Sequence, residues 1–294
     1  MFLSDDIIGH FLVAGTWLEK IKAEHLNWYM YWLIIISLFV YFLEVLFPWR
    51  KTQPRFRKDF WVDTFYMYFN LFLFPMLIFK FAAQELFNFT VFGLESVNLD
   101  FLISNRVAGL PLWGQILILF LVRDFTHWNI HRLLHRVPFL WSFHKVHHSV
   151  KEMGFAAHLR FHWMESAVYN TLQFIPLALL GFTLDSFIAV YVGTILIGHL
   201  NHSNFKLPLG PLKYIINNPQ MHIWHHAKKI PDGHKYGCNY GLSLSVWDYL
   251  FGTASIPEDG KDIELGFKED DLFPKGFLGQ IVYGFKKGSE KSPE

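Results

Sequence analysis

Histidine is the residue whose spacing in this chain points to chemistry. Fourteen of the sixteen histidines fall between residues 127 and 234. One pair lies four residues apart, and two triads have offsets of zero, three and four, which place their members on one face of a helix. The members are His131 and His135; His144, His147 and His148; and His222, His225 and His226. Because imidazole is the commonest metal-ligating side chain, this pattern predicts a metal site.

The number of imidazoles indicates more than one metal ion. A structural zinc site needs four ligands, so eight histidines that converge predict a dinuclear site. The chain has no HExxH motif and no pair of Glu-x-x-His motifs, and its single cysteine, Cys238, excludes a thiolate zinc site of the Cys₂His₂ kind. An all-imidazole site on the reducing side of a membrane suits iron, with zinc or copper as substitutes, and spacing does not choose between them. His127 lies four residues before His131 and is either a ligand or the hydrogen-bond partner of one.

Apolar stretches around the histidines predict membrane-spanning helices. They cover residues 28–47, 64–87, 110–122 and 167–200, and the last is broken at 180–182 into a helical hairpin. Hydrophobic residues make up 52% of the chain and charged residues only 17%, which is typical of a membrane protein. The basic loop over 50–58 favours the cytoplasmic side, and the order of spans then places every histidine segment there. We therefore expect an all-α polytopic membrane protein with about four to five transmembrane helices and a cytoplasmic histidine-rich helical cap.

The same patterns predict how the chain is divided. Residues 1–28 read as an amphipathic segment at the membrane surface, residues 29–280 as one membrane-embedded domain, and residues 281–294 as a disordered tail. The net charge is +1 and no basic repeat is present, so we expect no nucleic-acid partner.

The histidine segments resemble those of the fatty acid hydroxylase/sterol desaturase superfamily, whose members are membrane-bound di-iron oxygenases. HRLLH, HKVHH and HIWHH are similar to its histidine boxes. The segments FAAHLRFHWMES, NHSN and NYGLSLSVWDYLFGT are similar to the family's intervening and closing segments, with Trp163 where the family usually has proline. The resemblance runs from about Asp124 to Thr253, and the region between them is the predicted histidine-box region, 124–253.

The resemblance implies specific roles for residues of this chain. It adds His202 and His199 to the eight ligands named above, and His162 either binds metal or bonds to a ligand. It places Glu165, Asn204 and Asp124 next to the imidazoles, which they would orient. It also leaves Arg160 to pair with Glu165 or to meet a lipid headgroup.

The resemblance further implies an O₂-dependent oxidoreductase that hydroxylates or desaturates an alkyl C–H bond of a lipid. The lipid would be a sterol, a fatty acyl or sphingoid chain, or an ether lipid. Two iron ions would be the cofactors, O₂ a co-substrate, and a cytochrome b5-like protein, ferredoxin or reductase the separate electron donor. The location would be a bacterial inner membrane or the endoplasmic reticulum. Two alternatives stay open: a histidine-rich membrane metal transporter, and a zinc hydrolase that uses Glu165 as its base.

Overall fold

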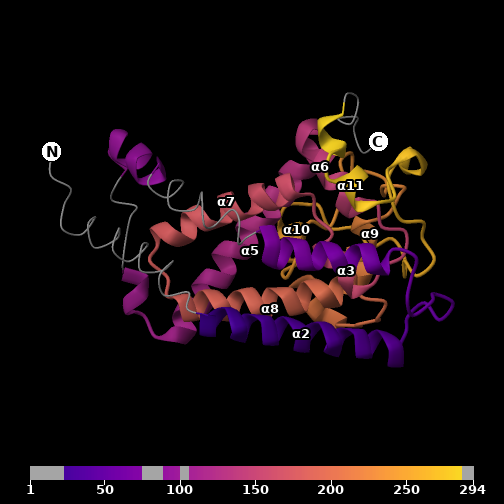
Figure 1. Ribbon diagram of the computed structural model, residues 1–294, viewed down its shortest axis with the longest axis horizontal. Helices are drawn as coiled ribbons and strands as arrows, with labels where there is room; N and C mark the ends of the chain where they lie inside the picture. The colour runs from indigo at the N-terminus through magenta and orange to yellow at the C-terminus, as the bar shows by residue number, and fades with distance from the viewer. Residues whose placement is uncertain (1–22, 75–88, 100–105, 287–294) are drawn as a thin grey trace.

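The computed structural model describes residues 23–74, 89–99 and 106–286 (Figure 1). These residues form helices, loops and three isolated bridges, and no strand occurs among them, so the expected all-α class is confirmed there. The longer helices are α2 (Ala23–Leu46), α3 (Phe60–Tyr68), α5 (Leu112–Arg136), α6 (Pro138–His148), α7 (Trp163–Leu179) and α8 (Leu184–His202). The shorter ones are the π-helix η1 (Phe69–Leu73), η3 (Arg106–Gly109), η4 (Phe155–Leu159), η5 (Gly210–Tyr214), α9 (Pro219–His225), α10 (Val246–Leu250), η6 (Asp270–Leu272), α11 (Phe277–Gln280) and η7 (Tyr283–Phe285).

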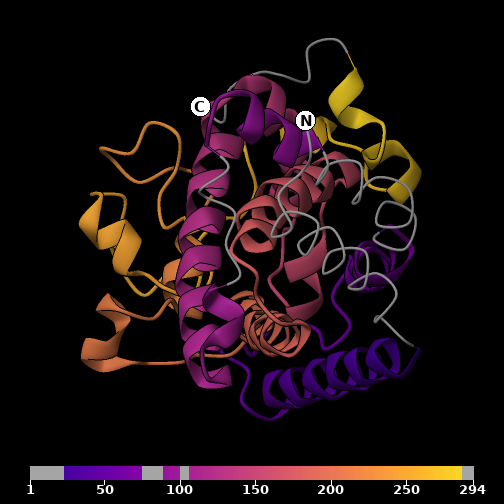
Figure 2. The same ribbon diagram turned by 90° about the vertical axis from the view of Figure 1, so that its left-hand side faces the viewer.

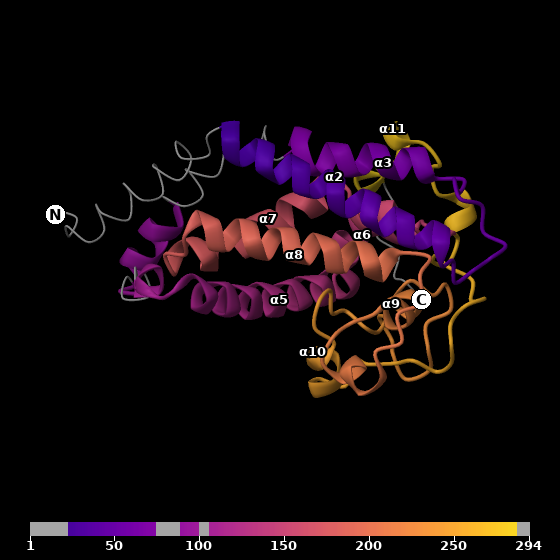
Figure 3. The same cartoon turned by 90° about the horizontal axis from the view of Figure 1, so that it is seen from below.

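The long helices lie side by side and lead to one end of the molecule. Helix α8 packs against both α2 and α5, as the end-on view in Figure 2 also shows. The loops that carry α9 and α10 gather beyond the ends of α5 and α8 (Figure 3). Segments that are far apart in the sequence therefore meet at that end, where the histidines lie.

Two described helices are long and apolar enough to cross a membrane. They are Trp28–Leu46 and Leu184–His202, which correspond to the first predicted span and to the second arm of the predicted hairpin. The hairpin breaks where expected, because α7 ends at Leu179, α8 begins at Leu184, and Gly181 between them has a φ of 70°. The second predicted span begins as α3 and η1, and its remainder over 75–88 lies outside the described residues, as do residues 1–22 of the predicted amphipathic segment.

Two boundaries differ from those expected. Helix α5 runs without interruption from Leu112 to Arg136, so the third predicted span and the first histidine pair lie on one continuous helix. The folded region also extends beyond residue 280, where we expect the tail to begin. Residues 281–286 include η7, and the Ile281 carbonyl accepts a hydrogen bond from Trp163 Nε1. The remaining tail, 287–294, lies outside the described residues.

Candidate metal centre

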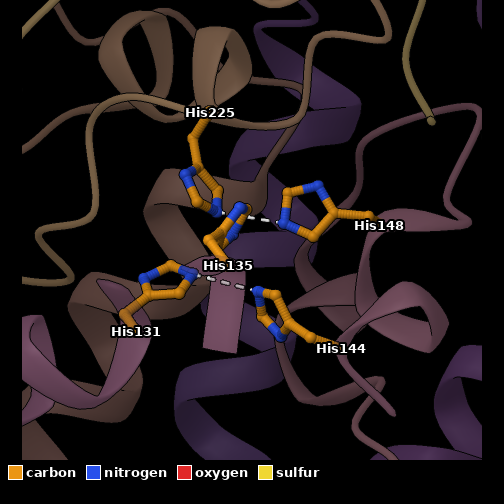
Figure 4. Close-up of side chains that lie close together, drawn as sticks. All are labelled: His131, His135, His144, His148 and His225. Carbon is orange, nitrogen blue, oxygen red and sulfur yellow. Dashed lines mark hydrogen bonds between the residues drawn. The ribbon is translucent and has the colours of Figure 1, made fainter. Parts of the chain in front are cut away.

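Nine histidines gather into two buried groups at the end of the helix bundle. Each of the nine is at most 4% exposed. Within each group the candidate ligand nitrogens lie within 4.8 Å of one another. The first group, drawn in Figure 4, contains His131, His135, His144, His148 and His225. The second contains His147, His202, His222 and His226.

Each histidine triad is shared between the two groups. On α6, His144 and His148 belong to the first group and His147 to the second. On α9 the assignment is reversed, because the residue at offset three, His225, joins the first group. The ring centroids of His148 and His226 lie 4.5 Å apart, so the two groups adjoin.

The sequence explains why α6 and α9, the helices that carry the two triads, begin where they do. Pro138 occupies the first turn of α6, where its missing N–H costs no hydrogen bond. Pro219 does the same in α9, and the Asn218 side chain caps that helix by accepting a hydrogen bond from Met221 N at 2.9 Å.

Hydrogen bonds fix the ring orientation in the first group. The Nδ1 atoms of His131, His135 and His225 lie 2.8, 2.9 and 2.8 Å from backbone carbonyl oxygens. A carbonyl only accepts, so each Nδ1 carries the proton, and Nε2 of the neutral ring presents a lone pair. Three such lone pairs therefore converge in a buried space, and the buried Nε2 of His135 has no hydrogen-bond partner among the described residues. This donor set fits a metal cation, which converging lone pairs would stabilise.

Glu165 orients a fourth imidazole of the first group. Its Oε1 lies 2.8 Å from Nδ1 of His144, and both side chains are buried. Burial raises the pKa of Glu165 and, together with neighbouring histidines, lowers the pKa of His144. A cation on Nε2 of His144 would favour the carboxylate form of Glu165, as in other carboxylate–histidine–metal arrangements.

The second group has four imidazoles and fewer orienting partners. Nε2 of His202 lies 3.2 Å from Nε2 of His147 and 2.9 Å from Nε2 of His222. Nδ1 of His202 is 2.8 Å from the carbonyl oxygen of Gly198, one helical turn earlier. The buried Nδ1 atoms of His147, His222 and His226 have no hydrogen-bond partner among the described residues. Four converging imidazoles fit one further metal ion.

Burial also sets the protonation state that ligation requires. It is the largest cause that lowers the pKa of the imidazoles supplied by α5, α6 and α9, with His131 lowered to about 4. These rings are therefore neutral at pH 7, and only the neutral ring offers a lone pair to a metal.

Two buried carboxylates hold the loop that supplies the carbonyl partners. Asp248 accepts hydrogen bonds from the Tyr240 and Gly241 backbone N–H groups at 2.9 and 2.8 Å, and from Trp128 Nε1 on α5 at 3.0 Å. Asp124 accepts from the N–H groups of Ser243 and Leu244 and from Trp247 Nε1. These bonds fix the segment whose Tyr240 carbonyl accepts from His131, so Asp124 acts on the imidazoles through the loop.

The model of the fatty acid hydroxylase family matches residues 116–253. The matched stretch, slightly less than half of the chain, is similar to the fatty acid hydroxylase family. This matched region, called the hydroxylase domain below, contains all nine clustered histidines. The resemblance seen in the histidine boxes is confirmed.

Relatives of this chain are lipid-modifying proteins by name. The ornithine lipid hydroxylase OlsE of Rhizobium tropici is 34% identical over 62% of this chain and 53% of its own length. The alkylglycerol monooxygenase of Xenopus tropicalis is 30% identical over 58% of this chain and 37% of its own. The very-long-chain aldehyde decarbonylase GL1-10 of Oryza sativa subsp. japonica is 32% identical over 50% of each. The chain thus spans about half or less of the length of these relatives, and no solved structure matches it.

Three predicted histidines of the hydroxylase domain lie outside both groups. His199 Nε2 is 3.2 Å from Ser37 Oγ, and its Nδ1 is 3.0 Å from Nδ1 of His158. His127 stacks on Tyr169 at 4.5 Å and lies 3.1 Å from the Gln173 amide nitrogen. His162 caps α7 by accepting from Met164 N, and its Nε2 lies 2.7 Å from the Ile281 carbonyl oxygen.

Two polar residues of the hydroxylase domain have partners other than those expected. Asn204 bonds to the Arg50 backbone, and its own N–H donates to Glu44, so it joins the end of α8 to the end of α2. None of its hydrogen bonds to the described residues reaches an imidazole. Arg160 does not pair with Glu165. Its Nη1 lies 2.9 Å from Asp63 Oδ1, and α3 supplies that carboxylate.

The structure also adds a histidine that spacing did not single out. The His158 ring is buried, and its centroid is 5.1 Å from that of His202. It packs on Gly198 of α8 so closely that a Cβ there would lie 2.1 Å from the ring. His158 lies four residues before His162, but the two residues lie on different elements, η4 and the N-cap of α7, so this interval does not bring them together. Only the close approach of η4 to α8 reveals the position of His158.

Proposed function

We propose that this chain is a membrane-bound, di-iron, O₂-dependent oxidoreductase that hydroxylates or desaturates an alkyl C–H bond of a lipid. The observation that carries the proposal is the convergence of nine buried histidines into two adjoining groups whose rings are oriented by carbonyl and carboxylate partners. The hydroxylase domain and the relatives named as a lipid hydroxylase and an alkylglycerol monooxygenase support the reaction type and the substrate class.

The residues divide the work between holding metal and orienting ligands. The nine histidines would hold two iron ions, for which zinc could substitute, and His199, His127 and His162 would act through neighbouring groups instead. When bound, reduced iron supplies the reactivity toward O₂ that no side chain possesses. Hydroxylation consumes O₂, two electrons and two protons, and it yields the alcohol and one water; desaturation yields the alkene and two waters. The burial of both groups excludes bulk water from the site.

The membrane and the electron donor belong to the same proposal. Helices α2 and α8 would cross the bilayer and deliver a lipid laterally to the histidine end of the bundle. The basic loop at 50–58 would place that end in the cytoplasm of a bacterial inner membrane or at the cytosolic face of the endoplasmic reticulum. Electrons would come from a separate cytochrome b5-like protein, ferredoxin or reductase.

The position of Glu165 argues against a zinc hydrolase on this scaffold. A hydrolytic base must reach a metal-bound water on the Nε2 side of the ligands. Glu165 instead bonds to Nδ1 of His144, on the opposite edge of the ring. A transporter would place its ligands along the membrane path. Seven of the nine histidines instead lie on α5, α6 and α9, outside the two helices that could cross a membrane. Of the two others, His202 is the last residue of the candidate span on α8, and His226 directly follows α9.

The test combines metal analysis with lipid analysis. We expect about two iron ions per purified chain, and an O₂-dependent lipid product that gains one oxygen or loses two hydrogens when cells express the wild-type protein. His147→Ala should abolish the product, whereas His234→Ala, at a histidine outside both groups, should retain it. An active protein free of transition metal, or a product formed equally without O₂, would refute the proposal.

A further inference from the structure

Arg123 is a buried cation without a carboxylate partner. It lies on α5 with 9% of its surface exposed, and none of the ion pairs formed by the described residues includes it. Its Nη1 donates to Thr194 Oγ1 at 2.9 Å, and its Cζ lies 5.2 Å from the centroid of the Tyr191 ring. The neighbouring Asp124 is already bonded to the loop at 243–247. A guanidinium has five N–H donors, and burying its charge without an anion is costly.

The guanidinium faces a cavity of about 80 Å³. Other polar groups of the lining bond to one another: Ser166 donates to Asn70 at 2.7 Å, and Gln173 contacts His127. Arg123 is thus the lining residue that carries a full charge and has N–H donors beyond the one that bonds to Thr194. A single water needs about 10–15 Å³, so the cavity accommodates a carboxylate or phosphate group and a few atoms attached to it, but not a long hydrocarbon chain.

Part of the cavity lining is apolar. Leu71, Leu159 and Ile195 are among the lining residues, and they belong to the hydrophobic cluster that α2 and α8 share. A ligand that matches both the guanidinium and the apolar lining has a charged end and an apolar end, which is the character of an anionic lipid.

The cavity adjoins both histidine groups. His127 and His158 form part of its lining, and their ring centroids lie 5.9 Å from that of His131 and 5.1 Å from that of His202, respectively. Arg123, His127 and His131 follow one another at four-residue intervals on α5, so they share one face of that helix. One layer of imidazoles therefore separates the cavity from the candidate ligands of each group.

We propose that this cavity is a subsite for the oxyanion of the lipid substrate, a carboxylate or a phosphate, and that Arg123 binds it. The subsite rests on the proposed function for its meaning, because the cavity lies one layer of imidazoles away from the candidate metal ligands and would hold the anionic end of the substrate there. The guanidinium matches both oxyanions, since it forms paired N–H···O bonds with either. Thr194 and Tyr191 hold the guanidinium in place from α8.

The experiment compares three amphiphiles with the same chain length on the full-length, metal-loaded protein in detergent. Palmitate carries a carboxylate, a lysophosphatidate carries a phosphate, and hexadecanol carries neither. We expect at least one of the two anions to bind the wild-type protein tenfold or more tightly than hexadecanol, as measured by titration calorimetry. Arg123→Gln should weaken the binding of that anion by ten- to a hundredfold and leave hexadecanol unchanged. The anion that binds more tightly identifies the headgroup chemistry.

Controls separate this subsite from the metal centre. Arg136→Gln removes an exposed arginine from the same helix and should retain anion preference. Arg123→Lys keeps the positive charge and is the control if Arg123→Gln fails to fold. The anion preference of Arg123→Lys should lie between that of Arg123→Gln and that of the wild-type protein. Metal content of the Arg123 variants should equal that of wild type.

Equal binding of all three amphiphiles to the wild-type protein would overturn the subsite, and Arg123 would then only tie α5 to α8. An anion preference that survives Arg123→Gln would overturn it as well. Neither outcome touches the metal analysis, whereas a protein without iron that still prefers the anion would refute the proposed function and leave the subsite standing.

Discussion

Replacement of Glu165 by glutamine should weaken the binding of one metal ion and leave the binding of the other unchanged. Glutamine has nearly the same size, so the substitution opens no cavity and changes only the charge and the hydrogen bonding. The residue contacts His144, which belongs to the first group, and no histidine of the second group bonds to it. The protein should therefore hold one metal ion with wild-type affinity and the other more weakly.

The magnitude follows from the single hydrogen bond that changes. A hydrogen bond to a charged acceptor contributes about 1.5–3 kcal/mol and a neutral one about 0.5–1.5 kcal/mol, so Glu165→Gln should cost about 1–1.5 kcal/mol, or roughly tenfold in metal affinity. The buried Oε2 of Glu165 has no hydrogen-bond partner among the described residues, so an amide N–H₂ placed there would find no acceptor and add to the loss. Glu165→Ala removes the acceptor altogether and should cost up to about a hundredfold.

The assay is equilibrium dialysis against a series of chelator concentrations, followed by elemental analysis of metal per chain. Wild-type protein and Glu264→Gln should give superimposable curves, because Glu264 forms only a surface pair with Lys228. Glu165→Gln should show one of its two release steps displaced by about tenfold. If both steps move together, or neither moves, the assignment of Glu165 to the first group alone is wrong.

Three further outcomes follow from the same geometry. His225→Ala should lower the metal affinity of the first group and His226→Ala that of the second, which a spectroscopic probe that distinguishes the two metals would report. Gly198→Ala should destabilise the protein by about 1–3 kcal/mol, because the new Cβ would lie 2.1 Å from a buried imidazole, whereas Gly193→Ala on the same helix meets open space and should stabilise it by up to about 1 kcal/mol in denaturant titrations. The metal-free protein should lose stability in acid, because burial lowers the pKa of the clustered imidazoles in the folded state. The contribution of these imidazoles to the free energy of unfolding is complete above their unfolded-state pKa of about 6.5. Below that pH the free energy of unfolding falls by up to about 1.4 kcal/mol per pH unit for each histidine. Melting temperatures that stay constant from pH 7 to pH 5 in the metal-free protein would contradict this last expectation.

Sequence spacing predicted that the three histidine segments converge, but it did not predict how each triad is divided. Residues at offsets three and four point about 100° apart around a helix axis, so a triad can serve one broad site or two adjoining ones. Only the tertiary arrangement of α6 and α9 decides that His147 and His225 join opposite groups. The sequence also did not predict which groups accept hydrogen bonds from the histidine rings. These acceptors are the backbone carbonyls of Tyr236, Cys238 and Tyr240, and their loop has no ligand-like residue pattern.

The sequence predicted the helices of the bundle better than it predicted the arrangement of the site. The apolar run before Phe47 and the break at Gly181 lie where the sequence places them, because length, hydropathy and glycine each act locally. The sequence did not predict the hydrogen bonds and ion pairs between helices. Arg160 selects Asp63 from a helix almost a hundred residues earlier in the chain, and Asn204 selects the end of α2, since these partners depend on tertiary packing.

The sharing of the triads has a consequence for how the protein is made. His225 belongs to the first group, and His222 and His226 belong to the second, so the first group is complete only after the ribosome has added residue 225 and the second only after residue 226. By then α2, α5 and α8 have all been synthesised, and the bundle can form before either site can close on a metal. Helix α9 and His226 therefore complete both metal sites after the helices of the bundle have been synthesised. A chain that terminates before α9 would leave both groups incomplete.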